Sequence, residues 1–291
     1  GTRWDAPLDG SQVPEAPIPS PAVIDLRRAA GRAGSAGRVG AAPPARRDLV
    51  PGSNNWAVAG AHTADRHALL AGDMHLTLGI PNTWYRASIV TPDAAAAASR
   101  RTVTGVTLPG TPALIAGSNG DVAWAFTNSE ADVADLVLLE MVPQAGPGAY
   151  RVPGGLAYLE THTEKIVVRG GADDSLVVQQ SRWGPVLGRD FAGRPRALRW
   201  TAHDPQALDL RLLGMELVRT VDEALALAPT CGIPPQNCVV ADGSGRIGWT
   251  ILGRLPRRAG FDGRRPVSWA DGSCRWDGLQ DGGEVPHVAD P

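Results

Sequence analysis

The sequence of 291 residues is poor in lysine and in long apolar runs. Lys165 is the only lysine, so arginine supplies nearly all of the positive charge, and the formal net charge is −2. No basic run with interleaved aromatic residues is present, which argues against nucleic acid as a partner. No apolar stretch approaches the roughly 20 residues that a membrane-spanning helix needs, so we expect no membrane span.

Cysteine is also scarce. Cys231, Cys238 and Cys274 show no CxxC spacing and no neighbouring histidine cluster, which argues against a zinc knuckle or a dense disulfide framework and leaves one disulfide open. The chain starts at Gly1 without methionine, and it lacks the charged-then-apolar start of a signal peptide. We therefore expect either that the start was removed or that the chain is a fragment.

Composition divides the chain into three stretches. Residues 1–28 are proline-rich with scattered apolar positions, which favours an extended segment over a helix. Residues 29–52 consist largely of Ala, Gly, Arg and Pro and contain too little apolar bulk to order themselves, which predicts a flexible spacer. Short strand-like runs separated by turns then begin, so a folded region is expected over residues 53–291.

The folded region is predicted to be rich in strands with few helices. Antiparallel hairpins are indicated around the turns at 118–121 and 242–245. Further strands are predicted at 103–108, 165–169 and 175–179, and helical periodicity occurs at 206–219 and 221–227.

Ser53 is the main candidate for a nucleophile, although Gly-Ser dipeptides recur along the chain. Gly52-Ser53 differs from the others because it joins the spacer to the first predicted strand. Glycine at the preceding carbonyl offers little steric obstruction, so Ser53 Oγ can attack it and form an ester that water hydrolyses. This predicts self-cleavage between Gly52 and Ser53, and a serine that merely begins a strand is the alternative.

Cleavage would leave an α-amine beside the Ser53 hydroxyl. Such an amine has an unperturbed pKa of about 7.7–8.0, so part of it is neutral near pH 7 and can act as base through a water. One residue would then supply both nucleophile and base, and a Ser-His-Asp triad would not be required.

Several sequence blocks resemble, in the same order, the catalytic β chain of the penicillin acylase family. Together they cover Ser53 to about Arg258, with Met74 standing where the family often has proline. The blocks are 52–56 (Gly-Ser-Asn-Asn-Trp) and 72–76 (Gly-Asp-Met-His-Leu), then 105–110, 117–120 and 122–128, then Asn237 with 239–242 and 245–248.

The resemblance implies an α+β fold, the four-layer αββα sandwich of N-terminal-nucleophile hydrolases, present here in part. Residues 1–28 would be the tail of an α-chain-like segment, residues 29–52 the spacer or propeptide, and residues 53–291 the N-terminal part of the catalytic β chain. The partner implied is a separate α chain of the same precursor, which forms a heterodimer with the β chain after cleavage. A periplasmic or secreted location is expected.

The implied activity is that of an acylase, which hydrolyses the amide bond of a small N-acyl compound such as a β-lactam antibiotic or an acyl-homoserine lactone. No organic cofactor is implied. The reaction needs donors for an oxyanion, and the resemblance assigns them to the backbone N–H of Asn128 and the side chain of Asn237. It also places His75 near the nucleophile and matches Arg258 to a family arginine. A turn role for Asn237, a structural role for His75 and a surface role for Arg258 are the alternatives.

Asp132 and Asp135, with the backbone carbonyl of Ala134, resemble part of the calcium site of penicillin acylases. Closely spaced oxygen ligands suit a hard cation, so structural Ca²⁺ is expected. Two carboxylates are too few for a site alone, and two solvated loop aspartates are the alternative.

Other interpretations compete with the acylase. Residues 116–120 approximate the nucleophile elbow of α/β-hydrolases, but a strand rather than a helix follows them, so Ser118 is expected in a hairpin turn. An uncleaved or catalytically incompetent family fragment that acts only as a binding or structural module is the main alternative. A metal hydrolase is disfavoured, because its candidate ligands match no zinc spacing: His62, His67, Asp73 and His75.

Overall fold

The computed structural model describes residues 52–76, 80–92 and 100–290, all within one compact unit. The predicted tail at residues 1–28 and nearly all of the predicted spacer at 29–52 lie outside these ranges. Among the described residues, no helix has the length and apolar character needed to cross a membrane.

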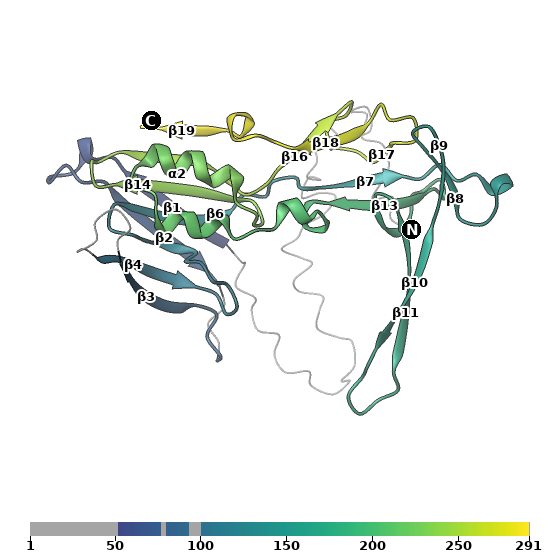
Figure 1. The fold of residues 1–291 in the computed structure, drawn as a ribbon, viewed down its shortest axis with the longest axis horizontal. Helices are drawn as coiled ribbons and strands as arrows, with labels where there is room; N and C mark the ends of the chain where they lie inside the picture. The colour runs from purple at the N-terminus through teal and green to yellow at the C-terminus, as the bar shows by residue number, and fades with distance from the viewer. Residues whose placement is uncertain (1–51, 77–79, 93–99, 291) are drawn as a thin grey trace, which may run out of the picture. The chain divides into compact units, whose positions relative to one another are not determined.

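A seven-stranded antiparallel sheet forms the centre of the fold, and both predicted hairpins are confirmed as neighbours within it. Its strand order is β19-β15-β14-β6-β5-β4-β3 (Figure 1). The strands are β3 (Tyr85–Pro92), β4 (Arg100–Thr107), β5 (Ala116–Ser118), β6 (Val122–Asn128), β14 (Gln236–Asp242), β15 (Ile247–Leu252) and β19 (His287–Ala289).

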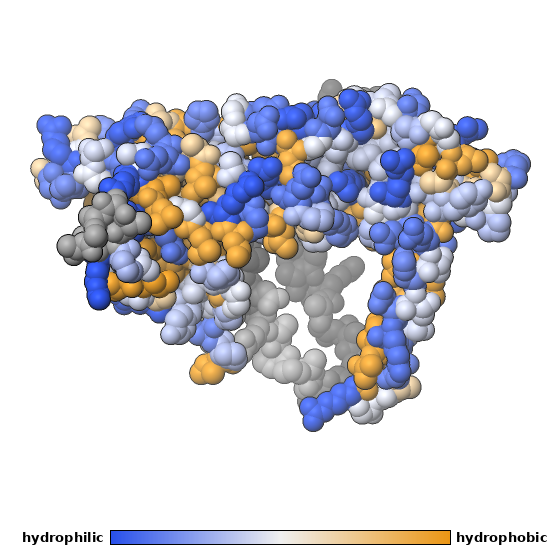
Figure 2. All heavy atoms as spheres, viewed as in Figure 1, coloured by the Kyte–Doolittle hydropathy of each residue, from blue (hydrophilic) through white to orange (hydrophobic). Residues whose placement is uncertain are grey.

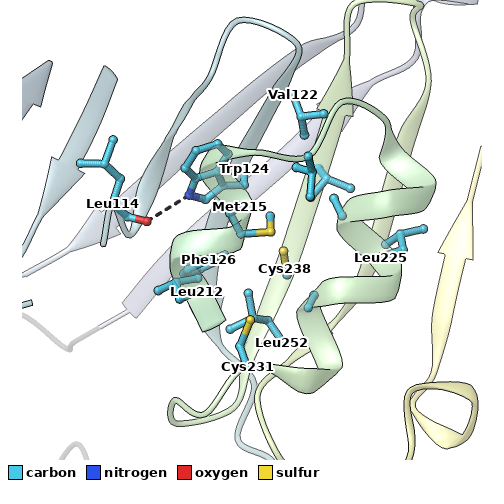
Figure 3. Packing of buried hydrophobic residues seen from close by; sticks show 14 of the residues in the cluster. Leu114, Val122, Trp124, Phe126, Leu212, Met215, Leu225, Cys231, Cys238 and Leu252 are labelled. Carbon is cyan, nitrogen blue, oxygen red and sulfur yellow. Dashed lines mark hydrogen bonds between the residues drawn. The ribbon is translucent and has the colours of Figure 1, made fainter. Parts of the chain in front are cut away.

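Short helical segments cover one face of this sheet. Helix α2 (Val221–Leu227), at the predicted position, contacts β14 and β15, and the Thr220 side chain caps its first turn. Alternate residues of β6, among them Trp124 and Phe126, pack against α2 and the 3₁₀ segments η5 (Arg211–Glu216) and η6 (Ala228–Thr230) (Figure 3). Trp124 satisfies its buried indole N–H by donating to the Leu114 carbonyl at 3.2 Å.

The helix predicted at 206–219 is wrong, because this stretch forms η4 (Pro205–Ala207) and η5 instead of one α-helix. The Asp209 carboxylate accepts hydrogen bonds from the backbone N–H groups of Arg211 and Gly232, which fixes the chain between the two segments. Tertiary contacts therefore override a helical periodicity here.

A six-stranded sheet, in the order β10-β11-β12-β13-β7-β17, has its own apolar cluster around Val137 and Trp269. The hairpin of β10 and β11 stands away from this cluster, and apolar side chains remain on its surface (Figures 1 and 2). Strand β10 ends at Ile166, so only the start of the strand predicted at 165–169 is observed. The strands are β7 (Ala134–Leu138), β10 (Glu160–Ile166), β11 (Asp174–Ser181), β12 (Gly184–Arg189), β13 (Pro195–Trp200) and β17 (Val267–Ser268).

Two-stranded pairs and single 3₁₀ turns complete the described residues. The pairs are β1 (Gly52–Val58) with β2 (Leu69–His75), β8 (Ala149–Val152) with β9 (Gly155–Tyr158), and β16 (Pro256–Ala259) with β18 (Arg275–Leu279). The turns are η1 (Gly60–His62), η2 (Pro143–Ala145), η3 (Thr201–His203) and η7 (Gly282–Glu284).

The β1–β2 hairpin lies on the face of the central sheet opposite the helical segments, against β6 and β14. Successive side chains of β6 point to opposite faces of the sheet. Trp124 therefore points to the helical segments, whereas Ala125 points to the hairpin. A Cβ on Gly72 would lie 2.9 Å from the Ala125 Cβ, so glycine permits this close approach. The helical segments, the central sheet and the hairpin thus form three successive layers, which correspond to part of an αββα sandwich.

Candidate active site

Ser53 is held at the start of β1 by the pairing of β1 with β2, in which Ser53 lies opposite Met74. Asn55 fixes β1 to the central sheet, because its side-chain amide donates to the Ala125 carbonyl at 3.0 Å. A backbone hydrogen bond of 2.8 Å from Gly60 to Gly245 ties the far end of β1 to the β14–β15 turn. The nucleophile candidate therefore lies on a hairpin anchored to the centre of the sheet.

The Ser53 side chain lines a cavity of about 390 Å³. Ser53 Oγ donates to the Gly52 carbonyl oxygen at 2.6 Å, which turns the hydroxyl toward the peptide bond expected to be cleaved. Among the described residues, no charged side chain lines the cavity, and most of the lining side chains are apolar. The lining residues are Ser53, Met74, Leu76, Trp84, Leu108, Thr111, Ile115, Phe126, Thr127, Asn128, Leu212, Ile233, Pro234 and Gln236.

Asn128 and Asn237 come together at the same end of the sheet. Asn128 ends β6 and lines the cavity with Ser53. Asn237 lies on the adjacent strand β14, and its Nδ2 donates to the Asn128 carbonyl at 3.1 Å. The Trp249 indole donates to Asn237 Oδ1 at 3.2 Å, which fixes the orientation of the amide and leaves its second N–H for another acceptor.

His75 lies across from Gly52 in the hairpin register, whereas Met74 lies across from Ser53. Because successive side chains of a strand point to opposite faces, His75 points away from the cavity that Ser53 and Met74 line. Its Nε2 lies 2.8 Å from Asp73 Oδ2 and 3.5 Å from Asn54 Nδ2, and the ring is about half exposed. The structure thus places His75 beside the residue preceding Ser53, and its catalytic role stays a prediction.

Arg258, on β16, joins the two aspartates of the predicted calcium site. Its Nε donates to Asp135 Oδ2 at 2.8 Å, and its NH2 lies 3.1 Å from Asp132 Oδ2. Neither Arg258 nor the aspartates line the cavity next to Ser53. Ala134, the third predicted ligand, begins β7 opposite Trp200 of β13. The sequence pattern gave no sign that Arg258 and the aspartates would meet.

Neither the alternative nucleophile Ser118 nor the alternative metal site has the geometry that its chemistry would need in the described part of the chain. Ser118 Oγ accepts from the Gly120 N–H at 3.1 Å, so Ser118 is a turn residue, as expected. His67 contacts the Gly243 carbonyl at 3.0 Å. Within residues 52–76, 80–92 and 100–290, no three His, Cys, Asp or Glu side chains gather as a metal site would require.

The cysteines, all three described, are free thiols. Burial raises the pKa of the Cys231 thiol to about 12, and burial also raises the pKa of Cys238. The disulfide left open by the sequence is therefore not formed, and neither buried thiol is activated as a nucleophile.

Sequence reasoning did not identify the residues that shape the cavity. Trp84, Leu212 and Ile233 come from three separate segments that lack any local motif. No sequence motif indicated Trp249 either, although its indole orients Asn237. Trp84, Leu212 and Ile233 lie outside the strands of the central sheet, so only the folded arrangement brings them to the cavity.

The chain is similar to known amidases and acylases over most of its length. The sequence profile of the penicillin amidase family matches residues 15–291. The chain is 30% identical over 246 residues to acyl-homoserine lactone acylase QuiP of Pseudomonas syringae pv. syringae, covering 83% of this chain and 29% of that protein. It is 32% identical to penicillin acylase 2 proenzyme of Pseudomonas sp. strain SE83, covering 82% of this chain and 30% of that protein.

A solved structure supports the fold. The thermostable penicillin G acylase of Alcaligenes faecalis matches with a TM-score of 0.67 and 25% sequence identity, over 81% of this chain and 42% of that one. The predicted α+β fold, as part of an N-terminal-nucleophile hydrolase sandwich, is thereby confirmed. The chain spans under a third of the length of the curated relatives named above.

Proposed function

We propose that this chain, which belongs to the penicillin amidase family, carries the nucleophile and the oxyanion donors of an acylase that hydrolyses amide bonds. One observation carries the proposal. Ser53, directly after Gly52, lines an apolar cavity together with Asn128, and Asn237 is hydrogen-bonded to Asn128. This places a hydroxyl, a backbone N–H and a side-chain amide around one end of the sheet.

Self-cleavage is the first step that we propose. Ser53 Oγ attacks the Gly52 carbonyl carbon, the acyl group passes from the Ser53 nitrogen to the oxygen, and water hydrolyses the ester. The contact of 2.6 Å between Oγ and the Gly52 carbonyl oxygen supports this step, because the hydroxyl already faces the scissile peptide group. The products are a Gly52 carboxylate and a new α-amine on Ser53.

Hydrolysis of the substrate would follow at the same atom. The neutral α-amine takes the Oγ proton through a water, and Oγ attacks the substrate carbonyl. The Asn128 N–H and the Asn237 Nδ2 would stabilise the oxyanion, the protonated amine would pass its proton to the leaving nitrogen, and water would release the acid. His75 lies opposite Gly52, so we assign it to the orientation of the new amine.

The cavity favours an uncharged, apolar acyl group. Burying a carboxylate without a cation to pair with it is costly, and the described lining contains no charged side chain. The relatives above are named as acylases of acyl-homoserine lactones and as a penicillin acylase. We therefore propose N-acyl compounds with an apolar acyl chain, such as acyl-homoserine lactones or β-lactam antibiotics, as the substrate class.

The family assignment also supports a partner. We propose that residues 1–28 are the tail of a separate α chain of the same precursor and that residues 29–52 are the spacer or propeptide. The α chain would stay with the β chain as a heterodimer after cleavage. A periplasmic or secreted location is part of the same proposal.

Intact mass and N-terminal sequencing test the proposal. We expect a new terminus that reads Ser-Asn-Asn-Trp, and hydrolysis of N-acyl substrates that appears with the cleavage. Ser53→Ala should leave the chain uncut and inactive, whereas the control Ser118→Ala should be cleaved as in wild type. An uncut but folded wild-type chain would favour a catalytically incompetent relative that only binds.

A further inference from the structure

A compact network of charges joins β16 and β18 to the segment that follows β6. Arg258 of β16 donates from Nε to Asp135 Oδ2 at 2.8 Å and from NH2 to the Asp132 carbonyl at 3.0 Å. The same NH2 lies 3.1 Å from Asp132 Oδ2. Trp276 of β18 donates from Nε1 to Asp135 Oδ2 at 2.5 Å. The Asp135 side chain is only 3% exposed and the Arg258 side chain 15%.

The residues present do not fit a calcium ion. Calcium takes six to eight oxygen ligands at about 2.3–2.6 Å, but Asp135 Oδ2, Asp132 Oδ2 and the Asp132 carbonyl are already in contact with Arg258. One buried oxygen, Asp135 Oδ1, has no hydrogen-bond donor. A divalent cation bound to this oxygen would lie beside the Arg258 guanidinium, and the two positive charges would repel each other.

Gly263 provides independent evidence that the chain is built around the guanidinium. A Cβ at this position would lie 2.6 Å from Arg258 Nε and 2.8 Å from Asp132 Oδ2. The backbone of Gly263 also has φ of +82°, which glycine adopts without the strain that a side chain would bring. The absence of a side chain thus leaves room for Arg258 at the point where it meets Asp132.

We propose that the Arg258 guanidinium takes the place of a metal ion in this network, so that the segment 129–135 is fixed to β16 without calcium. Arginine suits the task because its rigid fork of donors can bind a carboxylate and a carbonyl together. The metal expected from the resemblance is then not needed for the stability of this part of the fold. The proposal concerns binding and stability, so it stands or falls separately from the acylase activity.

The first test uses the wild-type chain. A ligand that binds the folded state raises its stability, so the melting temperature is measured after EDTA treatment and again with millimolar calcium. Terbium, a luminescent stand-in for calcium, is added separately, because a terbium ion bound here would be excited through Trp276. We expect equal melting temperatures and no tryptophan-sensitised emission. A calcium-dependent rise that Asp135→Asn abolishes, or sensitised emission from the wild type, would overturn the proposal.

The second test removes the guanidinium. Arg258→Gln should lower the melting temperature, and Arg258→Lys should restore only part of the loss because lysine keeps the charge without the fork. The matched control is Arg275→Gln on β18. Arg275 makes a longer contact of 3.6 Å with Asp277, and both side chains are exposed, so this variant should have a melting temperature close to that of wild type. An Arg258→Gln chain as stable as Arg275→Gln would contradict the proposal. If Arg258→Gln does not fold, the wild-type measurements decide alone.

Discussion

The side-chain amide of Asn237 is oriented by two hydrogen bonds, one from Trp249 to its oxygen and one from its nitrogen to the Asn128 carbonyl. Replacing the amide with a carboxylate removes the N–H donors and adds a negative charge where an oxyanion would form. We expect Asn237→Asp to lower kcat by about 10²–10³-fold, as for the loss of one oxyanion donor. Steady-state kinetics on an N-acyl substrate measures the effect.

The control for this substitution is Gln206→Glu, the same change of group at an exposed residue outside the cavity. It should leave kcat unchanged. Equal activity of Asn237→Asp and wild type would remove Asn237 from the proposed mechanism.

Sequence motifs located some site residues and not others, for a physical reason. Ser53 and Asn128, each in a block that resembles the family, line one cavity, and Asn237 is bonded to Asn128, while their catalytic roles stay predictions. The direction in which His75 points depends on the register of β1 and β2, because a shift of one residue would turn it to the other face. The pairing of Arg258 with Asp135 joins strands far apart in the sequence, and no local pattern encodes it.

At the scale of elements, the position of Ser53 depends on how closely β2 approaches β6. A methyl group on Gly72 would meet the Cβ of Ala125 at 2.9 Å, and that atom cannot move without the backbone of β6. We expect Gly72→Ala to displace the hairpin and to lower the rates of self-cleavage and hydrolysis by about 10²-fold, the cost of a misplacement near 1 Å. Timed intact-mass measurements follow the cleavage.

Gly283→Ala is the matched control, because a Cβ there would meet no atom within 4 Å. It should be cleaved at the wild-type rate. If Gly72→Ala were also cleaved at that rate, the hairpin would not need this close contact to place Ser53.

Asp242 links the β14–β15 turn to the start of α2. Its carboxylate accepts from the backbone N–H groups of Val221 and Ser244 and from the Ser244 hydroxyl. Burial acts to raise the pKa of Asp242, but the hydrogen bonds from Ser244, Val221 and Arg246 outweigh it and hold the pKa below its ordinary value. The folded state therefore favours the charged form.

A lowered pKa in the folded state gives stability that is present above the ordinary pKa of about 3.9 and is lost as the pH falls through the folded value. We expect Asp242→Asn to lower the free energy of unfolding by about 1–3 kcal/mol at pH 7. The gap to wild type should shrink below pH ~4. Denaturant titrations at several pH values measure it, with exposed Asp173→Asn as control. A gap that is constant with pH would contradict the charge-based explanation.

The turn residues allowed the two central hairpins to be predicted from the sequence. The conformation of the segment 206–219 could not be predicted in this way. The β5–β6 and β14–β15 turns carry glycine at Gly120 and Gly245, both with positive φ, between clear strand patterns. The segment 206–219 had a helical pattern, but its conformation is set by the contact of Asp209 with distant Gly232. Local sequence patterns predict a structure that is fixed by a local turn, but they do not predict a conformation that is fixed by a contact between distant residues.

At the scale of the whole described chain, large apolar side chains remain exposed on the β1–β2 hairpin and on the edge strand β3. Trp56 is 53% exposed, Leu69 52% and Tyr85 67%. Exposed apolar surface of this kind marks contact regions. We therefore expect the 291-residue chain to bind the dye ANS in its folded state, measured by fluorescence. No dye binding before unfolding would contradict the exposure of these side chains.

The described residues contain two apolar clusters on different sheets. One joins the central sheet to α2, and the other surrounds Trp269, whose ring lies 5.6 Å from Phe261 and 6.1 Å from Trp183. Because the cavity next to Ser53 is lined from the first cluster and not from the second, the two should be separable in stability. The region around Trp269 could then open while the candidate site stays folded.

Trp269→Ala tests this separation, since removing a buried tryptophan costs about 3–5 kcal/mol. Hydrogen exchange should lose protection mainly in β7, β13 and β17, while β6, β14 and β15 keep theirs and self-cleavage at Ser53 continues. Leu252→Ala, in the first cluster, should give the reverse pattern and impair cleavage. A uniform loss of protection in both variants would mean that the two sheets unfold as one cooperative unit, and the candidate site would then depend on every part of the described fold.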